Sequence, residues 1–405
     1  MNDITPMTLR SDPDAGLPEE IIPLCEPEIR GNEWKYIKEC LDTKWVSSAG
    51  PAVERFETAV VKYVGAKYGV ATANGTTALH IALLVSGIRP EEEVLVSTLT
   101  FIAPANAIRY VGAWPIFMDA DPLYWQMDPE KVADFLKKEC FWQRNALYNK
   151  TTGRRVRAIL TVHILGHSCD MDPIVEIARK YNLLVIEDAS ESLGARYKGR
   201  MVGQLADIAC FSFNGNKIIT TGGGGMILTD NEGWATRARY LTTQAKDNPV
   251  ESVHNEIGYN YRLTNIQAAL GCAQMEKLDE YVDIKRGIAR AYTQGFSSVP
   301  GITCMQEASW ASSIFWIYTM LVDETNYGMA SRALHGHLKG ARVETRPLWQ
   351  PLHRSPAHKG AQAYHCEFAE ALFNNALRLP SSVGLKLPEQ QKVIEFIRRF
   401  SKGNR

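Results

Sequence analysis

The sequence predicts an α/β protein in which a large domain with a mainly parallel β-sheet precedes a smaller α+β C-terminal domain. Between about residues 66 and 230, short apolar runs alternate with amphipathic helical patterns, as when helices pack on a parallel sheet. Beyond about residue 251 a long helical stretch and a few shorter elements replace this alternation. The chain has 405 residues, 45% of them hydrophobic, which is enough to bury a large core in two lobes.

The elements of the large domain follow from its periodicity. Apolar, β-rich runs predict strands at residues 94–97, 115–118, 158–162, 183–187, 208–213 and 226–229. Apolar residues at three- and four-residue spacing predict helices at residues 76–86, 103–111, 128–138 and 171–181. We interpret the basic, polar interruption at residues 144–157 as a solvated loop, in preference to a contact for a substrate phosphate.

The smaller domain shows fewer and longer patterns. They predict a long helix at residues 265–292, an apolar strand at 315–322, and helices near 331–339 and 388–400. We therefore expect a disordered N-terminal tail at residues 1–20, the large domain at 21–250 and the small domain at 251–405. The tail has no sustained apolar run and no later segment reaches transmembrane length, so we expect neither a signal peptide nor a membrane partner.

Charge and cysteine usage narrow the class of protein. Lys plus Arg (45) balances Asp plus Glu (45), so no overall field attracts nucleic acid or an anionic membrane. The eight cysteines form no Cys-x-x-Cys pair, which indicates neither a disulfide framework nor a zinc site. We expect reduced cysteines, a cytoplasmic location and no bound metal.

Asp188 and Lys217 each follow a predicted strand. Ligands of open α/β sheets bind where strands end, although Asp188 alone could equally cap a helix. Lys217 alone could be an exposed loop lysine, but it lies between the strand end at Ser212 and the glycines at 222–225, which let the backbone pass close to a bulky group. A lysine amine can hold a cofactor aldehyde as an imine, and an aspartate can keep a pyridine nitrogen protonated. The pair therefore indicates pyridoxal-phosphate chemistry.

The sequence lacks the motifs that mark nucleoside triphosphate and nicotinamide cofactors. The glycine run is not followed by the lysine and Ser/Thr pair of a P-loop, and a strand follows where that motif needs a helix. No Gly-x-Gly-x-x-Gly occurs at a strand-helix turn with an acid about 20 residues on, so a nicotinamide-dependent oxidoreductase is not indicated.

Three further segments could contact a ligand. Gly75 and Thr76 open a helix after a strand and could hold a phosphate, although a plain helix cap is the favoured interpretation of this motif alone. Phe101 follows another strand and could stack on a pyridine ring, although a lone aromatic residue at such a position is more often part of the core. His163 ends another strand, and a structural role is the safer interpretation unless it touches the cofactor.

Together these segments closely resemble the DegT type of nucleotide-sugar aminotransferases, which are fold-type I (aspartate aminotransferase-like) pyridoxal-phosphate enzymes. The resemblance spans roughly residues 22–400. It rests on Phe56-Glu57 with Tyr63 and Gly65, Gly75-Thr76, Val162-His163 with Gly166, Glu187-Asp188-Ala189, Ser212-Phe213, Lys217, the glycine run, and Gly258 to Arg262.

The resemblance implies roles for these residues. Lys217 would form the Schiff base with pyridoxal 5'-phosphate and then move a proton between cofactor and substrate. Asp188 would pair with the pyridinium nitrogen, and Phe101 would stack on the ring. The residues expected to hold the phosphate are Gly75, Thr76 and Ser212, joined by Asn260 of the partner subunit. The protein would therefore be a homodimer with shared active sites.

Some positions separate branches of the family. Relatives that act as dehydratases carry histidine in place of the lysine, so Lys217 argues against that branch. Glu191, expected to contact the cofactor, stands where many relatives carry Gln or His, and Gly223 stands where they often carry Glu. The segments at 212–221 and 255–262 look most like the subgroup serving legionaminic acid and bacillosamine synthesis, which aminates C4 of nucleotide-linked 2-acetamido-4-keto-6-deoxy sugars.

Four residues are expected to bind the substrate: His163, Arg346, Trp349 and His353. Trp349 could pack on a sugar or base and Arg346 could meet a phosphate, but a buried tryptophan and a surface salt bridge are equally plausible. The expected reaction moves the amino group of glutamate, through pyridoxamine phosphate, to C4 of a UDP- or GDP-linked 2-acetamido-4-keto-2,6-dideoxyhexose. The alternatives are amination at C3 of a nucleotide-linked 3-keto sugar and a pyridoxal-phosphate-binding regulator without turnover.

Overall fold

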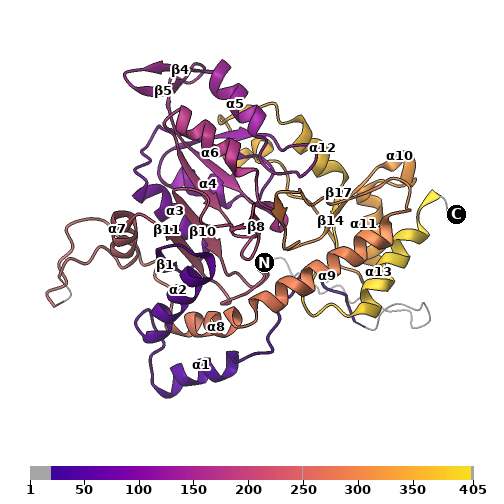
Figure 1. Cartoon of the computed structure of the whole chain (residues 1–405), viewed down its shortest axis with the longest axis horizontal. Coiled ribbons are helices and arrows are strands. Elements are labelled where there is room, and N and C mark those ends of the chain that lie inside the picture. Colours follow the sequence, from indigo (N-terminus) through magenta and orange to yellow (C-terminus); the bar gives the residue numbers. More distant parts are fainter. Residues whose placement is uncertain (1–19, 249, 403–405) are drawn as a thin grey trace, which may run out of the picture.

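The apolar runs of the first half of the chain pair into one ten-stranded, mostly parallel sheet (Figure 1). The computed structural model describes residues 20–248 and 250–402, so the predicted tail lies outside the described residues except for Glu20. The main path of the sheet is β1 (Tyr68–Thr72), β11 (Gly225–Thr229), β10 (Ile208–Ser212), β7 (Leu184–Asp188), β6 (Arg155–Val162), β2 (Glu93–Ser97), β3 (Trp114–Met118) and β16 (Gln362–Tyr364). Only β11 runs against its neighbours on this path.

The six predicted strands of this sheet are confirmed. Their interior residues are almost all buried, as expected for a parallel sheet that is covered on both faces. The four predicted helices are also present, as α3 (Gly75–Val85), α4 (Ala103–Tyr110), α5 (Pro129–Lys138) and α6 (Met171–Lys180). Among the described residues before 250, three further helices were not predicted: α1 (Glu33–Asp42), α2 (Pro51–Val64) and α7 (Glu232–Thr242).

The interpretation of residues 144–157 as a loop is wrong. The chain forms a hairpin from β4 (Cys140–Gln143) and β5 (Ala146–Asn149), and β6 already begins at Arg155. The turn residues Arg144 and Asn145 have positive φ angles of 49° and 60°. A two-residue turn with both φ angles positive matches the twist of paired strands, which explains how a polar segment closes this hairpin.

The second lobe is built on a four-stranded antiparallel sheet, β12 (Ile302–Cys304), β14 (Thr319–Val322), β17 (Ala376–Arg378) and β15 (Arg346–Pro347). The predicted long helix is two helices, α8 (Asn265–Met275) and α9 (Leu278–Phe296). The predicted strand at 315–322 begins only at Thr319, and Phe315 has a φ angle of 47°, outside the range of a strand. The remaining helices are α10 (Glu324–Tyr327), α11 (Ser331–Gly340), α12 (Glu367–Asn375) and α13 (Leu387–Arg399). Figure 1 shows α9, α11 and α13 around this sheet.

The chain crosses between the two lobes more than once. Strand β16 pairs with β3 in the large sheet although it follows most of the second lobe in sequence. A small third sheet joins β8 (Arg196–Tyr197), β9 (Arg200–Met201) and β13 (Ala311–Ser312). Short 3-10 turns lie at Ile164–Gly166, Leu352–Arg354 and Pro356–His358. The division at residues 250 and 251 stays a prediction, and β16 shows that the large sheet needs residues from both sides of it.

Within residues 20–248 and 250–402, no helix combines the length and apolar character needed to cross a membrane. The same part of the chain holds no group of three or more His, Cys, Asp or Glu residues arranged for a metal ion.

Candidate active site

The strand-end residues singled out in the sequence meet at the carboxyl edge of the large sheet. Asp188 ends β7, where it pairs with Val162 of β6 on one side and Cys210 of β10 on the other. The Asp188 side chain accepts a hydrogen bond of 3.1 Å from the Ser190 main-chain N–H. Burial raises the pKa of the Asp188 carboxyl, while Ser190 and the nearby charge of Lys217 oppose the rise. A second positive charge in this corner would stabilise its ionised form.

Lys217 lies in the same corner and faces a second carboxylate. Its Nζ is 3.5 Å from Glu191 Oε1 and 4.0 Å from the centroid of the Trp316 ring. Burial raises the pKa of Glu191, and the charge of Lys217 opposes this rise. Glu191 lies in a turn after β7, not in a helix, and its other oxygen accepts a hydrogen bond of 2.8 Å from the Leu165 N–H.

The segment before Lys217 is held from the second lobe. The Asn216 carbonyl accepts hydrogen bonds from the Trp316 indole N–H at 2.8 Å and from the Cys25 thiol at 3.2 Å. Behind them, the buried Lys285 amine donates to the Trp316 carbonyl at 2.7 Å. Trp316 therefore holds the backbone beside Lys217 through its indole N–H, and its ring is the surface that the Lys217 amine faces. Neither Trp316 nor Lys285 was singled out in the sequence, where they look like ordinary helix and strand residues.

The start of α3 leaves donors free for an anion. Asn74 caps the helix by accepting a hydrogen bond of 2.9 Å from the Thr77 N–H, so the N–H groups of Gly75 and Thr76 have no acceptor within the helix. A Cβ added to Gly75 would lie 2.8 Å from Ser212 Cβ and 3.4 Å from Ser190 Oγ. The two hydroxyls and the helix start thus share one corner, which fits a phosphate group. Ser190 was missed because only the fold brings it there.

The glycine run has a packing role next to this corner. Gly225 pairs with both Ser212 and Thr72 at the start of β11. A Cβ on Gly225 would lie 2.4 Å from the Asn74 carbonyl oxygen, so only glycine lets β11 pass beneath the start of α3.

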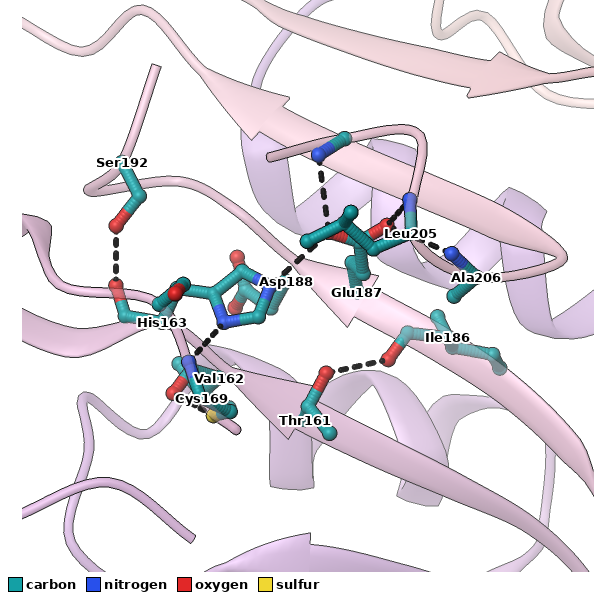
Figure 2. A network of polar contacts seen from close by, with 12 residues as sticks. Thr161, Val162, His163, Cys169, Ile186, Glu187, Asp188, Ser192, Leu205 and Ala206 are labelled. Carbon is teal, nitrogen blue, oxygen red and sulfur yellow. Dashed lines mark hydrogen bonds and ion pairs between the residues drawn. The ribbon is translucent and has the colours of Figure 1, made fainter. Parts of the chain in front are cut away.

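His163 supports the site from within the sheet (Figure 2). Its ring is fully buried, and Nδ1 accepts a hydrogen bond of 3.0 Å from the Cys169 N–H. The ring proton is therefore on Nε2, which donates to Glu187 Oε2 at 3.0 Å. Figure 2 also shows Glu187 accepting hydrogen bonds from the N–H groups of Leu205 and Ala206. Both ring nitrogens therefore have partners within the protein, and the expected contact of His163 with the substrate stays a prediction.

Two of the predicted cofactor contacts lie on the open surface of the single chain. The Phe101 side chain, just before α4, is 57% exposed. Asn260 is also exposed, and its backbone forms a bridge with Thr243. Their expected roles in stacking and in reaching a partner's cofactor remain predictions.

The second lobe presents the other predicted substrate residues. The Arg346 side chain is 60% exposed and pairs with Glu344 at 2.8 Å. Trp349 is partly buried, and the guanidinium carbon of Arg378 lies 4.8 Å from the centroid of its ring. Arg378 was missed, although an arginine within the apolar run that forms β17 is an unusual feature of the sequence.

His353 contacts both lobes. Its Nδ1 lies 2.8 Å from Thr98 Oγ1, just after β2, and its Nε2 lies 2.9 Å from Glu370 Oε1 on α12. The ring therefore ties α12 to the carboxyl edge of the large sheet.

A lysine amine next to two carboxylates, close to a helix start with free N–H groups, suits a cofactor that has an aldehyde, a basic ring nitrogen and a phosphate. The fold and the site thus define a pyridoxal-phosphate enzyme of fold-type I.

The model of the DegT/DnrJ/EryC1/StrS aminotransferase family matches residues 27–398, and the chain belongs to this family. GDP-perosamine synthase of Caulobacter vibrioides is 39% identical over 374 residues, which cover 92% of this chain and 96% of that protein. GDP-perosamine synthase of Escherichia coli O157:H7 is 39% identical over 379 residues, which cover 94% and 98%. The aminotransferase TlmJ from Streptoalloteichus hindustanus has a similar structure, with a TM-score of 0.85, 26% identity and coverage of 94% of this chain and 98% of that chain. The chain is a nucleotide-sugar aminotransferase, which confirms the family, fold, enzyme class and cofactor expected from the sequence.

Proposed function

We propose that this chain transfers the amino group of glutamate to C4 of a UDP- or GDP-linked 4-keto-6-deoxy sugar, with a 2-acetamido sugar as the expected form. The observation that carries the proposal is the Lys217 amine, 3.5 Å from Glu191 and in the same corner as the buried Asp188. Amination at C4 is supported by the two relatives named GDP-perosamine synthase, because perosamine is a 4-amino sugar.

Lys217 is the proton carrier in this proposal. When bound, pyridoxal phosphate supplies a ring that withdraws electrons from the substrate carbon. The Lys217 amine removes the proton from the α-carbon of glutamate and later delivers a proton to C4 of the sugar. Asp188 holds the proton on the ring nitrogen, and Glu191 orients the amine by accepting its hydrogen bond.

The phosphate group is held by the N–H groups of Gly75 and Thr76 and by the Ser212 hydroxyl, with Ser190 beside them. We propose a homodimer in which Asn260 of the partner subunit completes this set. Support comes from exposed aromatic residues at the two ends of α4: Phe101 lies just before the helix and Tyr110 is its last residue, and each is 57% exposed. Exposed apolar side chains of this size suit an interface between subunits.

The second lobe would bind the nucleotide sugar. Trp349 offers a ring face for the sugar, and the exposed Arg346 offers a charge for the diphosphate. His353 acts through position, because its two ring nitrogens already contact Thr98 and Glu370. The legionaminic acid or bacillosamine pathway stays part of the proposal. A cytoplasmic location also stays a prediction, consistent with eight cysteines that are all free.

A panel of nucleotide-linked keto sugars tests the proposal. Purified enzyme with glutamate is offered UDP- and GDP-linked 4-keto and 3-keto sugars, with and without a 2-acetamido group, and NMR identifies the product. Amination at C4 is the expected result. Turnover of a 3-keto sugar alone would contradict the regiochemistry, and turnover with no nucleotide sugar would contradict the function.

A further inference from the structure

Two buried side chains from different lobes contact the Lys217 amine. Glu191 Oε1 lies 3.5 Å from Lys217 Nζ, and the centroid of the Trp316 ring lies 4.0 Å from it. Glu191 follows β7 of the large sheet, whereas Trp316 precedes β14 of the second lobe. The amine therefore has within reach a carboxylate that accepts its hydrogen bond and an aromatic face that attracts a positive charge.

The main chain of Leu165 ties these two side chains to each other. The Leu165 N–H donates a hydrogen bond of 2.8 Å to Glu191 Oε2, and the Leu165 carbonyl accepts one of 2.9 Å from the Trp316 main-chain N–H. A Cβ on the next residue, Gly166, would lie 2.6 Å from the Trp316 nitrogen, so only glycine lets the two main chains approach so closely. One short segment of the large domain thus sets the positions of both groups that the amine faces.

The other polar groups of Trp316 are fixed as well. Its carbonyl accepts a hydrogen bond of 2.7 Å from the buried Lys285 amine, and its indole N–H donates one of 2.8 Å to the Asn216 carbonyl. Asn216 directly precedes Lys217 in the chain, so the indole holds the backbone of the same residue whose amine its ring faces. The ring and the lysine therefore have a defined position relative to each other.

Strained backbone occurs at both ends of this arrangement. Leu165 and Phe315, the residue before Trp316, have φ angles of 59° and 47°. Bulky residues rarely adopt these left-handed angles, which cost free energy and persist where surrounding contacts enforce them, often at functional sites. A tryptophan that only filled space in the core would not need two strained residues to place it.

The aromatic ring distinguishes the two states of the amine that the proposed reaction requires. When Lys217 takes the proton from the α-carbon of glutamate, the electron pair of the C–H bond stays with the substrate, and the amine becomes a positively charged ammonium group. The face of an indole ring attracts an ammonium group much more strongly than a neutral amine. Unlike the Glu191 carboxylate, the ring has no lone pair that could take the proton over. The ring therefore stabilises the proton-carrying state of Lys217 and leaves the proton on its nitrogen.

We infer that Trp316 is a positioning residue that holds the Lys217 amine on its ring while the amine carries the proton. This inference rests on the proposed function, because it requires Lys217 to be the proton carrier. Trp316 acts through Lys217, so it contributes to the rate of proton transfer and not to the binding of either substrate.

Two variants separate the aromatic face from the rest of the side chain. Trp316→Phe keeps a ring and Trp316→Leu removes it, and both remove the indole N–H. In the purified holoenzyme, the change in cofactor absorbance gives the rate and the apparent affinity of the half-reaction with L-glutamate and with glutamate deuterated at the α-carbon.

The two variants should differ in rate. We expect Trp316→Leu to lower the rate at saturating glutamate about tenfold, equivalent to about 1.4 kcal/mol, and to change the apparent affinity less than about threefold. The deuterium isotope effect should rise in Trp316→Leu, because proton transfer becomes slower relative to the other steps. Trp316→Phe should keep both the rate and the isotope effect close to those of the wild type.

Amide hydrogen exchange of the cofactor-free protein supplies a readout that does not depend on activity. Both variants leave the Asn216 carbonyl with the weaker thiol donor of Cys25. The Lys217 N–H donates to the Asn214 carbonyl at 3.0 Å in the same turn, so we expect it to exchange up to about tenfold faster in both variants.

The matched controls are Trp234→Phe and Trp234→Leu. Trp234 lies on α7 beside Asp207, which directly precedes β10, whereas Ser212 ends that strand at the site. We expect both control variants to leave the half-reaction, the isotope effect and the exchange of the Lys217 amide unchanged.

Several outcomes would overturn the inference. A wild-type rate in Trp316→Leu would do so, and so would equal losses in Trp316→Phe and Trp316→Leu, because the aromatic face would then have no effect of its own. A weaker apparent affinity with an unchanged rate and isotope effect would instead make Trp316 a substrate contact. Unchanged exchange of the Lys217 amide in both variants would show that the indole does not hold this segment.

Failure of the proposed function is distinguishable from these outcomes. A wild-type enzyme that does not react with glutamate would contradict the proposed function, and hydrogen exchange would still test the hold of Trp316 on the Lys217 segment. Circular dichroism checks that Trp316→Phe and Trp316→Leu are folded.

Discussion

Replacing Gly75 by alanine should disturb the corner that we assign to the cofactor phosphate. The added Cβ would lie 2.8 Å from Ser212 Cβ and 3.2 Å from Ser212 Oγ. Because carbon atoms normally approach to about 3.5–4.0 Å, the start of α3 and the end of β10 must separate by roughly 0.7 Å or more. Overpacking of this kind costs about 1–3 kcal/mol. The N–H groups of Gly75 and Thr76 would then no longer converge with the Ser212 hydroxyl.

Urea denaturation of the cofactor-free protein measures the loss of stability caused by the added methyl group. Titration with pyridoxal phosphate measures the loss of cofactor affinity. We expect Gly75→Ala to lower the free energy of unfolding by about 1–3 kcal/mol and to weaken cofactor binding at least about tenfold, or about 1.4 kcal/mol. Gly336→Ala is the matched control. Gly336 lies inside α11 with no atom within 4 Å of an added Cβ, so alanine there should leave the unfolding free energy unchanged or raise it by up to about 1 kcal/mol.

The double variant Gly75→Ala/Ser212→Gly tests the cause. Removing the Ser212 side chain removes the two closest contacts of the new methyl group, so the two changes should be coupled by about 1 kcal/mol or more in a double-mutant cycle. Additive losses of stability, or a Gly75→Ala protein with unaltered stability and cofactor affinity, would refute the steric reasoning.

Three further predictions concern other parts of the site and its support. Lys217→Ala should abolish the visible absorbance of the bound cofactor and lower transaminase activity at least about a thousandfold with an unchanged circular dichroism spectrum; retention of activity would exclude Lys217 as the proton carrier. Glu187→Gln should lower the free energy of unfolding, measured by urea titration, by about 3 kcal/mol, because the buried carboxylate accepts hydrogen bonds from three main-chain N–H groups and from His163. Glu395 is exposed, so the control variant Glu395→Gln should have little effect in the same titration. Burial lowers the pKa of His167 to about 4 from its ordinary 6.5. Between these two pH values the unfolded state binds more protons than the folded state, so the free energy of unfolding should fall by up to about 3 kcal/mol as the pH drops from 6.5 to 4. His167→Gln should flatten this part of the curve, and identical pH profiles for the two proteins would contradict the shift.

The parallel sheet was predictable because its signals are local. Each of its buried strands is a short apolar run, and the polar residues Asp188 and Ser212 come where such runs stop. The carboxyl ends of parallel strands meet at one edge, so the order of elements alone indicates that these residues are neighbours. Lys217 could be assigned to the same site from the sequence, because the glycine run after it marks a place where the backbone passes close to another group.

Other parts of the fold depend on signals that the sequence reasoning did not use. The basic, polar character of residues 144–157 indicates a loop, and the turn of the β4–β5 hairpin lacks the glycine that usually marks two residues with positive φ. The helical pattern at 265–292 has no strong breaker, yet the structure interrupts it between the end of α8 at Met275 and the start of α9 at Leu278. Strand β16 is only three residues long, and it is a strand because β3 offers it an open edge.

The sequence by itself determined the class of enzyme, since lysine, aspartate and the helix start supply chemistry that depends on residue type and on order along the chain. Tertiary structure decided how these groups are supported and what else surrounds them. It turned His163 toward Glu187, placed Ser190 beside Gly75, and brought the Trp316 ring of the second lobe within 4.0 Å of the Lys217 amine. The physical reason is that burial, hydrogen-bond partners and electrostatic interactions depend on distances in space, which the order of residues does not specify for contacts between the two lobes.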